Sequence, residues 1–479
     1  MAGTGCDILI AGDPFPPRGT RGMKIVLVRP NYKSHIITPP LGLGYLASYL
    51  RQNGMETRII DGLRNNLSPD ETMRMIAAEN PDAVGITCLT AFYGETVRLA
   101  RMVKERNIRC IIGGVHPTFL PYGTLVDSRA DYVICGEGEV ALSKLARNGF
   151  VNDGIPGVYS LDNLPGEDAP VRKGEIIEDL DDIPFPDWDQ MDPNAYPKAP
   201  HGAIVNGFPI GVVTSSRGCP YQCTFCASPA FYGRRIRFRS PENVVAEIRH
   251  LVERFGVREI HFEDDNLTMN RGHVERICRL ILDGGIKVSW ACPNGIRADK
   301  VDEDLIALMK ESGCYYFAYG IESADDGILK NIRKMETIET IGKSIGIAAR
   351  HGISCQGFFI LGLPGETRET IEKTISFAKR SKLARAQFLI LDVIPGSELW
   401  DVLRGRFVPD WGKNSYKEPE WIPEGLTKGD LMKAQAAAFR RFYLRPGVFL
   451  GLARSIKPQQ VKYLFQRLFD FRIIRKPGA

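Results

Sequence analysis

The sequence lacks the features that mark membrane-spanning, secreted or nucleic-acid-binding proteins. None of its 479 residues belong to an apolar run of eighteen, the length that a spanning helix needs. Residues 1–22 have no charged start followed by an apolar stretch, so they do not resemble a signal peptide. The net charge is only +5, and no basic segment interleaved with aromatic residues indicates a nucleic-acid partner. We therefore expect a cytoplasmic protein with reduced thiols and no bound nucleic acid.

The first 22 residues also lack a strand or helix pattern. They are rich in Gly and Pro and precede Met23, after which the first convincing strand begins. This composition predicts a disordered extension over 1–22. A start of translation at Met23 instead of Met1 is the alternative interpretation.

Three of the 11 cysteines fall in one short loop. They are Cys219, Cys223 and Cys226, at C-x-x-x-C-x-x-C spacing. A zinc site normally takes four ligands from two paired half-sites, and no second half-site follows. A ferredoxin-type run would carry a fourth cysteine, which is also missing. The pattern favours an iron–sulfur cluster with one open position, with zinc or purely structural cysteines as alternatives.

Strand and helix patterns alternate through residues 23–149. Five strands are expected, at 24–30, 57–61, 82–87, 110–114 and 131–139. This alternation predicts a doubly wound, flavodoxin-like parallel sheet whose ligand binds at the carboxyl ends of the strands. No G-x-G-x-x-G follows the first strand, so nothing favours a dinucleotide.

The rest of the chain divides into three parts. Residues 150–207 predict a linker that contains a small hairpin and a Pro- and Asp-rich stretch. Residues 208–395 contain six strand–helix repeats, which predict a partial, TIM-like (βα)₆ barrel with its chemistry at the carboxyl ends of the strands. Residues 396–479 predict a helical C-terminal region, in which Thr427 is a candidate N-cap.

The cysteine loop resembles that of the radical S-adenosylmethionine (SAM) enzymes, since Phe225 precedes the last cysteine as in their C-x-x-x-C-x-Φ-C motif. The resemblance implies a 4Fe–4S cluster on the three cysteines, with SAM on the open iron. Glu322 has a second interpretation as a buried salt-bridge partner, and the carboxylates at 263–265 a second one as a divalent-metal site. The residues expected to contact SAM are Phe225, Glu263, Asp264, Asp265, Asn294, Glu322, Ser323 and Gly362.

Residues 23–149 resemble the cobalamin-binding domain found ahead of many radical SAM barrels. Thr87-x-Leu89 and Gly113-Gly114 match two parts of its fingerprint, but the first part, Asp-x-His-x-x-Gly, is missing. A lower axial histidine on cobalt is therefore in doubt, and His35 is the one nearby candidate, with a surface-loop histidine as the alternative. The residues expected to contact cobalamin are Thr87, Leu89, Gly113, Gly114, His116, Gly136, Glu137 and Gly138.

The resemblance implies reductive cleavage of SAM to a 5′-deoxyadenosyl radical and methylation of an unactivated carbon through methylcobalamin. An external one-electron donor of the flavodoxin or ferredoxin type is implied too. No residue can be assigned a catalytic role in acid–base or nucleophilic chemistry. The same phrases resemble the anaerobic magnesium-protoporphyrin ester cyclases, so ring formation is the rival hypothesis. A non-enzymatic iron–sulfur or cobalamin sensor is the third, although no output module supports it.

The C-terminal end is strongly basic. From Arg440 onward there are ten Lys or Arg against one acid, and 458–471 carries an amphipathic helical pattern. Such a segment can cap a domain or lie on an anionic membrane. The second use predicts peripheral contact with the inner face of the membrane and a lipid or tetrapyrrole substrate.

Overall fold

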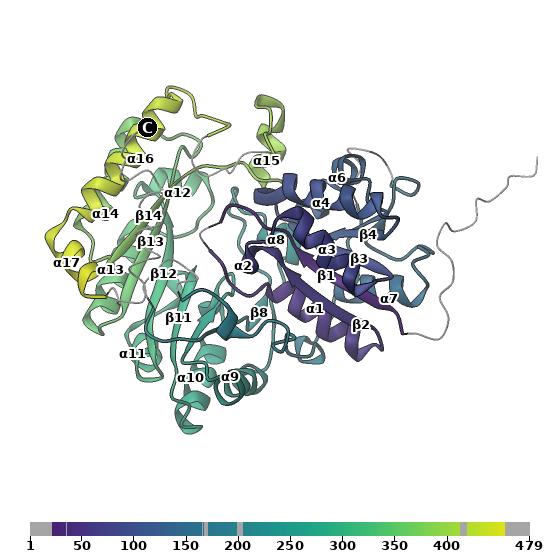
Figure 1. Cartoon of the computed structure of the whole chain (residues 1–479). Helices are drawn as coiled ribbons and strands as arrows, with labels where there is room; N and C mark the ends of the chain where they lie inside the picture. The colour runs from purple at the N-terminus through teal and green to yellow at the C-terminus, as the bar shows by residue number, and fades with distance from the viewer. Residues whose placement is uncertain are drawn as a thin grey trace, which may run out of the picture.

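The protein forms two α/β lobes that lie side by side (Figure 1). This computed structural model describes residues 22–34, 36–164, 166, 171–198, 205–411 and 419–455. The predictions for residues 1–21, His35 and 458–471 lie outside the described residues.

The first lobe is built on a six-stranded sheet with the order β2-β1-β3-β4-β5-β6, of which the first five strands run parallel. The parallel order 2-1-3-4-5 is that of the flavodoxin-like fold, in which the ligand site lies at the switch point between β1 and β3. The predicted doubly wound sheet is confirmed. Its strands are β1 (Lys24–Arg29), β2 (Glu56–Asp61), β3 (Ala83–Thr87), β4 (Arg109–Gly113), β5 (Tyr132–Ile134) and β6 (Val158–Tyr159).

Helices cover both faces of this sheet. The predicted start at Ser68 is present as a capping box, in which Ser68 and Glu71 satisfy each other's backbone N–H groups. All six residues of β1 are buried, as expected for a central parallel strand. The helices are α1 (Leu41–Gln52), α2 (Gly62–Asn65), α3 (Pro69–Glu79), α4 (Tyr93–Glu105), α5 (Val115–Phe119), α6 (Pro121–Ser128) and α7 (Glu139–Arg147).

The hairpin predicted within 150–207 differs from the structure. Its first arm, β6, pairs antiparallel with β5 and so extends the first sheet. The second arm forms no strand in the part of the chain that is described, but Arg172 donates its N–H to the Tyr159 hydroxyl at 2.8 Å. The sequence pattern could not show that β5 offers β6 an open sheet edge, which replaces the local partner.

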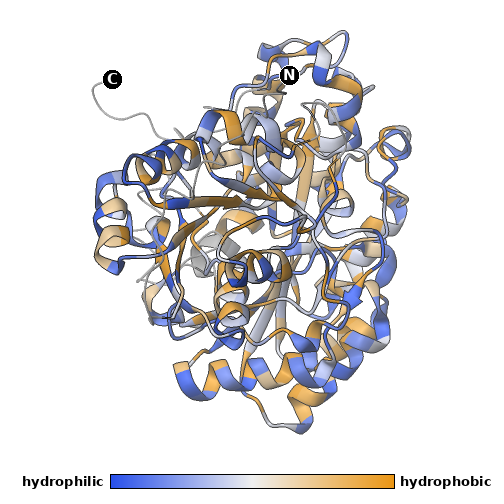
Figure 2. Cartoon of the chain, turned by 90° about the vertical axis from the view of Figure 1, so that its right-hand side faces the viewer, coloured by the Kyte–Doolittle hydropathy of each residue, from blue (hydrophilic) through white to orange (hydrophobic). Residues whose placement is uncertain are grey.

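The second lobe is a partial barrel of six parallel strands in the order β14-β13-β12-β11-β10-β7. Within the described residues β7 and β14 stand at the two edges, so the predicted open (βα)₆ architecture is confirmed. Hydrophobic strands lie inside, and the surrounding helices turn hydrophilic residues outward (Figure 2). The strands are β7 (Ile210–Val213), β10 (Glu259–Phe262), β11 (Ser289–Ile296), β12 (Cys314–Glu322), β13 (Ser354–Leu361) and β14 (Arg385–Ile390).

Helices alternate with these strands on the outside of the barrel. The two short helices α8 and α12 follow the cysteine loop and β12. The set is α8 (Ser228–Tyr232), α9 (Pro241–Phe255), α10 (Arg271–Asp283), α11 (Glu303–Glu311), α12 (Asp326–Asn331), α13 (Ile338–Arg350) and α14 (Arg368–Arg380).

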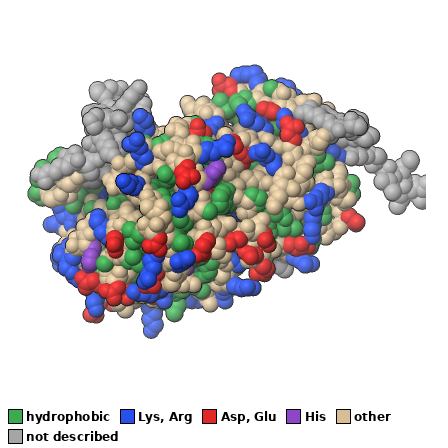
Figure 3. Space-filling view, turned by 90° about the horizontal axis from the view of Figure 1, so that it is seen from below, with side chains coloured by type: hydrophobic (Ala, Val, Ile, Leu, Met, Phe, Trp, Pro, Cys, Tyr) green, Lys and Arg blue, Asp and Glu red, His purple; other side chains and the backbone are tan. Residues whose placement is uncertain are grey.

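The C-terminal region is helical where it is described, with α15 (Glu398–Leu403), α16 (Lys428–Tyr443) and α17 (Pro446–Ser455). Thr427 caps α16 as predicted, through a capping box with Asp430. The helix α16 packs on β14 and α14 through the fully buried Leu431 and Phe442. No helix among the described residues is long and apolar enough to cross a membrane. On the face seen from below, acidic and basic side chains are interspersed (Figure 3).

Candidate functional site

The loop that carries the three cysteines begins and ends at a small two-stranded antiparallel sheet, called the base below. The strands β8 (Ser216–Arg217) and β9 (Arg237–Phe238) pair antiparallel and close the loop at residues 218–236. Gly218 enters the loop with φ +107°, and a Cβ there would lie 2.7 Å from the Arg235 carbonyl oxygen. A glycine is therefore required where the loop begins.

The thiols of Cys219, Cys223 and Cys226 are half-buried and close enough to interact electrostatically. Burial raises the pKa of all three thiols, that of Cys226 to about 12. Without a metal the thiols would therefore stay protonated at neutral pH, since burial disfavours the charged thiolate. Bound iron supplies the positive charge that stabilises the thiolates.

A second loop, residues 332–336, contacts the cysteine loop. The Thr224 N–H donates to the Ile332 carbonyl at 3.1 Å, and the Cys223 thiol lies 3.8 Å from the Arg333 carbonyl oxygen. The Arg297 guanidinium stacks 3.7 Å from the centre of the Tyr221 ring, between two of the cysteines in sequence. These contacts fix the backbone that carries the thiols.

Glu322 and Lys334 form a buried ion pair beside Cys223. Their charged atoms lie 3.1 Å apart, and each side chain is 9% exposed. The pair confirms the salt-bridge interpretation of Glu322. Glu322 also has φ +64°, a strained conformation for a residue other than glycine, which holds its carboxylate at the end of β12. Lys334 was not expected from the sequence, because no motif marks it and only the fold brings it to the cysteines.

The carboxylates after β10 have different surroundings. Asp264 is buried and accepts hydrogen bonds from the Ser215 N–H and from the Ser215 and Ser216 hydroxyls, at 2.5–3.1 Å. Asp265 is exposed, accepts a hydrogen bond from Ser228, and interacts electrostatically with the thiols of the cysteine loop. The carboxylate of Asp265 therefore remains accessible beside the cysteine loop, while that of Asp264 anchors the start of this loop.

The side chains of the remaining predicted SAM residues contact other parts of the protein. Asn294 is exposed and donates to the Glu263 carbonyl at 3.0 Å, so these two strand ends meet. Ser323 is fully buried, and its hydroxyl lies 3.3 Å from that of Thr374 on α14. The Phe225 ring is partly buried against the core.

Gly362 begins the loop after β13 with φ +89°. The Glu366 carboxylate accepts its N–H at 2.6 Å and that of Leu363 at 3.0 Å. Burial raises the pKa of Glu366 to about 7. Glu366 therefore closes this loop, while Thr367 caps the helix that follows.

In the first lobe, two glycines at the end of β4 differ in their surroundings. A Cβ on Gly114, which has φ +115°, would lie 2.5 Å from the Cys88 carbonyl oxygen. A Cβ on Gly113 would have no atom within 4 Å, so this glycine borders open space at the carboxyl end of the sheet. Leu89, which follows β3 two residues after Thr87, is 42% exposed beside it. An open glycine edge with an exposed leucine fits a flat, largely apolar ligand.

His116 is buried in an aromatic cluster at the start of α5. Its Nδ1 lies 3.1 Å from the Thr90 hydroxyl, and its ring packs 4.2 Å from Tyr93 and 5.1 Å from Trp411, centre to centre. Burial lowers the pKa of His116 to about 3, so the ring is neutral. Trp411 comes from the C-terminal region, and no motif predicts that it covers this helix start.

The loop after β5 joins the two lobes. Gly136 has φ +91°, and its N–H donates to the Thr118 hydroxyl at 2.9 Å. Glu137 is buried and binds Arg217 of the barrel at 2.6 Å. Gly138 precedes α7, and a Cβ there would meet Leu46 at 3.3 Å. Of these three predicted cobalamin residues, Glu137 is committed to the neighbouring lobe.

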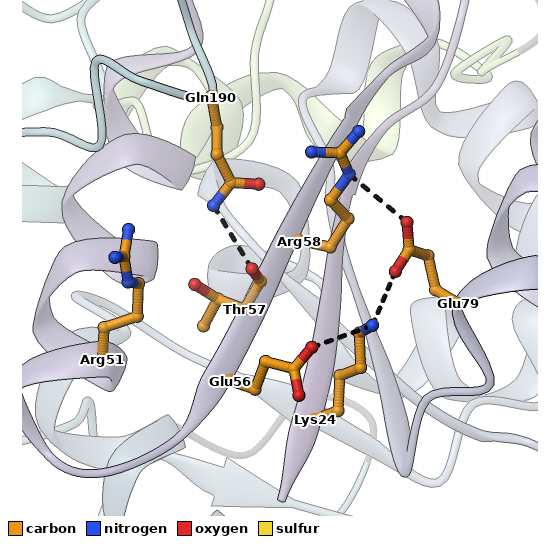
Figure 4. Close-up of a pocket in the computed structure, with 7 residues that line it drawn as sticks. All are labelled: Lys24, Arg51, Glu56, Thr57, Arg58, Glu79 and Gln190. Carbon is orange, nitrogen blue, oxygen red and sulfur yellow. Dashed lines mark hydrogen bonds and ion pairs between the residues drawn. The ribbon is translucent and has the colours of Figure 1, made fainter.

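A cavity of about 350 Å³ lies at the opposite, amino-terminal edge of the first sheet (Figure 4). Lys24 there pairs with Glu56 at 3.0 Å and Glu79 at 2.6 Å, and Glu79 also binds Arg58 at 3.4 Å. Both of its carboxylates are paired with cations of the lining, and it lies away from every predicted site residue. The cavity lies where the linker packs on the first sheet, since Gln190 of the linker forms hydrogen bonds with the backbone of β2.

The donor set fits an iron–sulfur cluster better than one metal ion. Among the described residues, no three His, Cys, Asp or Glu side chains are gathered closely enough to hold a single ion. A cluster of four irons spreads its thiolate ligands further apart, as three cysteines on one loop can do. The carboxylates at 263–265 likewise form no divalent-cation site in the described part of the chain.

Two protein-family models match this chain, one in the barrel with the cysteine loop and one in the first lobe. The model of the radical SAM superfamily matches residues 213–378, which include the cysteine loop and most of the barrel. The model of the B12 binding domain matches residues 32–146 in the first lobe. The chain therefore carries the two domains of a cobalamin-binding radical SAM enzyme.

Three curated relatives span most of the chain. An uncharacterized methyltransferase of Pyrococcus horikoshii is 35% identical over 89% of this chain and 94% of its own length. The cytidylyl-2-hydroxyethylphosphonate methyltransferase of Streptomyces wedmorensis is 30% identical, over 89% and 90%. An anaerobic magnesium-protoporphyrin IX monomethyl ester cyclase of Rubrivivax gelatinosus is 29% identical, over 94% and 82%. The protein belongs to the family of cobalamin-dependent radical SAM methyltransferases and related cyclases, whose cofactors are a 4Fe–4S cluster, SAM and cobalamin.

A solved structure shares the fold. The radical SAM methyltransferase TsrM of Kitasatospora setae, with cobalamin and a [4Fe–4S] cluster bound, superposes with a TM-score of 0.67 at 18% identity. The match covers 89% of this chain and 82% of that one. The two lobes therefore adopt a known two-domain arrangement.

Proposed function

We propose that this enzyme methylates an unactivated carbon of a small-molecule substrate at a site between its two lobes. The observation that carries the proposal is the contact of Glu137, at the end of β5, with Arg217, two residues before Cys219. It brings the carboxyl end of the cobalamin-type sheet to the cysteine loop. Two cofactor sites in contact suit a reaction that uses both.

In this proposal the residues of the chain bind the cofactors and position them. Cys219, Cys223 and Cys226 hold the cluster, and the exposed carboxylate of Asp265 receives the amino group of SAM. Gly113 and Leu89 offer the flat edge on which cobalamin rests. When bound, these cofactors supply one-electron cleavage of SAM and methyl transfer, which no protein side chain can perform.

The other residues predicted to contact SAM and cobalamin remain binding candidates, except Glu137, whose carboxylate binds Arg217 and Arg237. We propose the domain limits 23–149, 150–207, 208–395 and 396–479. The barrel site also needs an external one-electron donor of the flavodoxin or ferredoxin type, because no second cluster motif occurs in the sequence.

Labelled SAM separates methylation from ring formation. With SAM carrying an isotope in its methyl group, strong reductant and a candidate substrate, we expect the label in the product. Mass spectrometry of the product is the measurement. A product oxidised or cyclised without label would support the cyclase hypothesis, for which the Rubrivivax relative is the supporting observation. Absence of 5′-deoxyadenosine with intact cluster and cobalamin would contradict both.

The C-terminal helices support a second proposal, peripheral contact with a lipid surface and a lipophilic substrate. At the end of α16 and on α17, Leu444 is 69% exposed, Phe449 62% and Leu450 51%. Exposed apolar residues in a basic region are typical of segments that lie on anionic membranes.

Vesicle flotation tests this contact. Replacing Phe449 and Leu450 together with Ser is expected to lower binding to phosphatidylglycerol vesicles at least about a hundredfold, because about 2 kcal/mol of apolar burial per large side chain is lost, about 4 kcal/mol for the two. Leu161→Ser is the matched control, since Leu161 is 53% exposed on the first lobe. Equal binding by the double variant and the native chain would contradict the proposal.

A further inference from the structure

The contact between Glu137 and the base of the cysteine loop has a specific geometry. Arg217 of β8 and Arg237 of β9 are directly opposite each other in the two-stranded base, which lies where the lobes meet (Figure 1). Both side chains are buried, with 12% and 2% of their surface exposed. Two like charges opposite each other in a sheet repel, so this base is unstable unless a carboxylate lies between them.

The first lobe supplies that charge. Glu137 accepts from Arg217 at 2.6 Å and from both terminal nitrogens of Arg237, one of them at 3.3 Å. Glu139 accepts from the second nitrogen of Arg217 at 2.8 Å. The two arginines and two carboxylates balance, and both oxygens of Glu137 are occupied. The carboxylate of Glu137 is therefore directed at the arginines of the barrel.

This network of two carboxylates and two arginines is adjacent in sequence to both predicted cofactor sites. Gly136, next to Glu137, lies in the glycine loop at the carboxyl end of the first sheet, and Arg217 is separated from Cys219 only by Gly218. The base β8–β9 closes the whole loop from 218 to 236. A shift of the base against β5 thus changes the distance between the cobalamin edge and the cysteines.

We propose that Glu137 is a positioning residue that fixes the cobalamin edge and the cysteine loop at the separation that methyl transfer requires. This inference rests on the proposed function, and it assigns Glu137 a role in the distance between two sites instead of in binding at one. Displacements of about 1 Å can slow a reaction about a hundredfold, so the network acts on methyl transfer while each cofactor site stays intact.

The test uses the full chain, reconstituted without oxygen with cluster and cobalamin, in the native form and as Glu137→Gln. With SAM and a strong reductant, the rate at which labelled methyl reaches cobalamin is divided by the rate of 5′-deoxyadenosine release. We expect this ratio to fall at least about tenfold in Glu137→Gln, while iron content and cobalamin absorbance remain those of the native protein.

Two further variants make every outcome decisive. Asp187→Asn is the matched control, because Asp187 is a buried carboxylate of the linker that binds Arg51 of the first lobe at 2.7 Å, away from the strand ends. It should leave the ratio unchanged. Arg237→Lys weakens the network from the barrel side and replaces Glu137→Gln as the test if that variant does not fold. It should lower the ratio in the same direction.

An unchanged ratio in the variant that folds would overturn the inference, and so would a lower ratio that is accompanied by loss of bound cobalamin, which would make Glu137 a cofactor contact. Failure of the native protein to release 5′-deoxyadenosine or to transfer label would instead overturn the proposed function. The two failures are therefore distinguishable.

Discussion

Replacing Cys226 with Ala is expected to abolish the release of 5′-deoxyadenosine while cobalamin uptake remains. The cluster needs all three thiolates of the loop, because every other cysteine among the described residues is buried elsewhere in the fold. Burial raises the pKa of the Cys226 thiol to about 12, so without bound iron this side chain stays protonated and is not a free nucleophile. The measurement is 5′-deoxyadenosine by chromatography after anaerobic reconstitution with SAM and a strong reductant.

Cys355→Ala is the matched control. Cys355 is buried in β13 and packs in the core, so its loss removes a small apolar side chain and leaves the cysteine loop intact. We expect native iron content and native SAM cleavage in this variant. Cleavage that persists in Cys226→Ala with an intact cluster would show that the loop is not the cluster site.

The fold was largely predictable from the sequence because it repeats one local pattern. Buried strands such as β1 alternate with amphipathic helices, and helix starts at Ser68 and Thr427 carry capping chemistry that depends on neighbouring residues alone. The pairing of β6 with β5 was not predictable, because β5 becomes an open sheet edge only when the first sheet is assembled.

The site was predictable where spacing fixes it and unpredictable where the fold does. The cysteines and Gly113-Gly114 stand out because their chemistry requires adjacent residues. Lys334 and Trp411 carry no local signal, and only long-range packing brings them to Cys223 and His116. Glu137 is predicted to contact cobalamin, whereas its carboxylate binds the arginines of the other lobe.

The two glycines at the end of β4 give the second large effect. Replacing Gly113 with Leu adds a side chain where no atom lies within 4 Å, so the protein should fold normally. The leucine would occupy the open edge where cobalamin is proposed to rest. We expect the Kd for cobalamin to rise at least about a hundredfold, equivalent to about 2.7 kcal/mol, as measured by absorbance titration.

Gly114→Ala provides the contrast at the neighbouring position. Its Cβ would meet the Cys88 carbonyl at 2.5 Å in a backbone conformation with φ +115°, which strains the folded state itself by about 1–3 kcal/mol. Thermal unfolding should therefore move to lower temperature in Gly114→Ala and stay close to native in Gly113→Leu. Native cobalamin affinity in Gly113→Leu would mean that the cofactor lies elsewhere, because a folded protein with this edge filled has no room for it there.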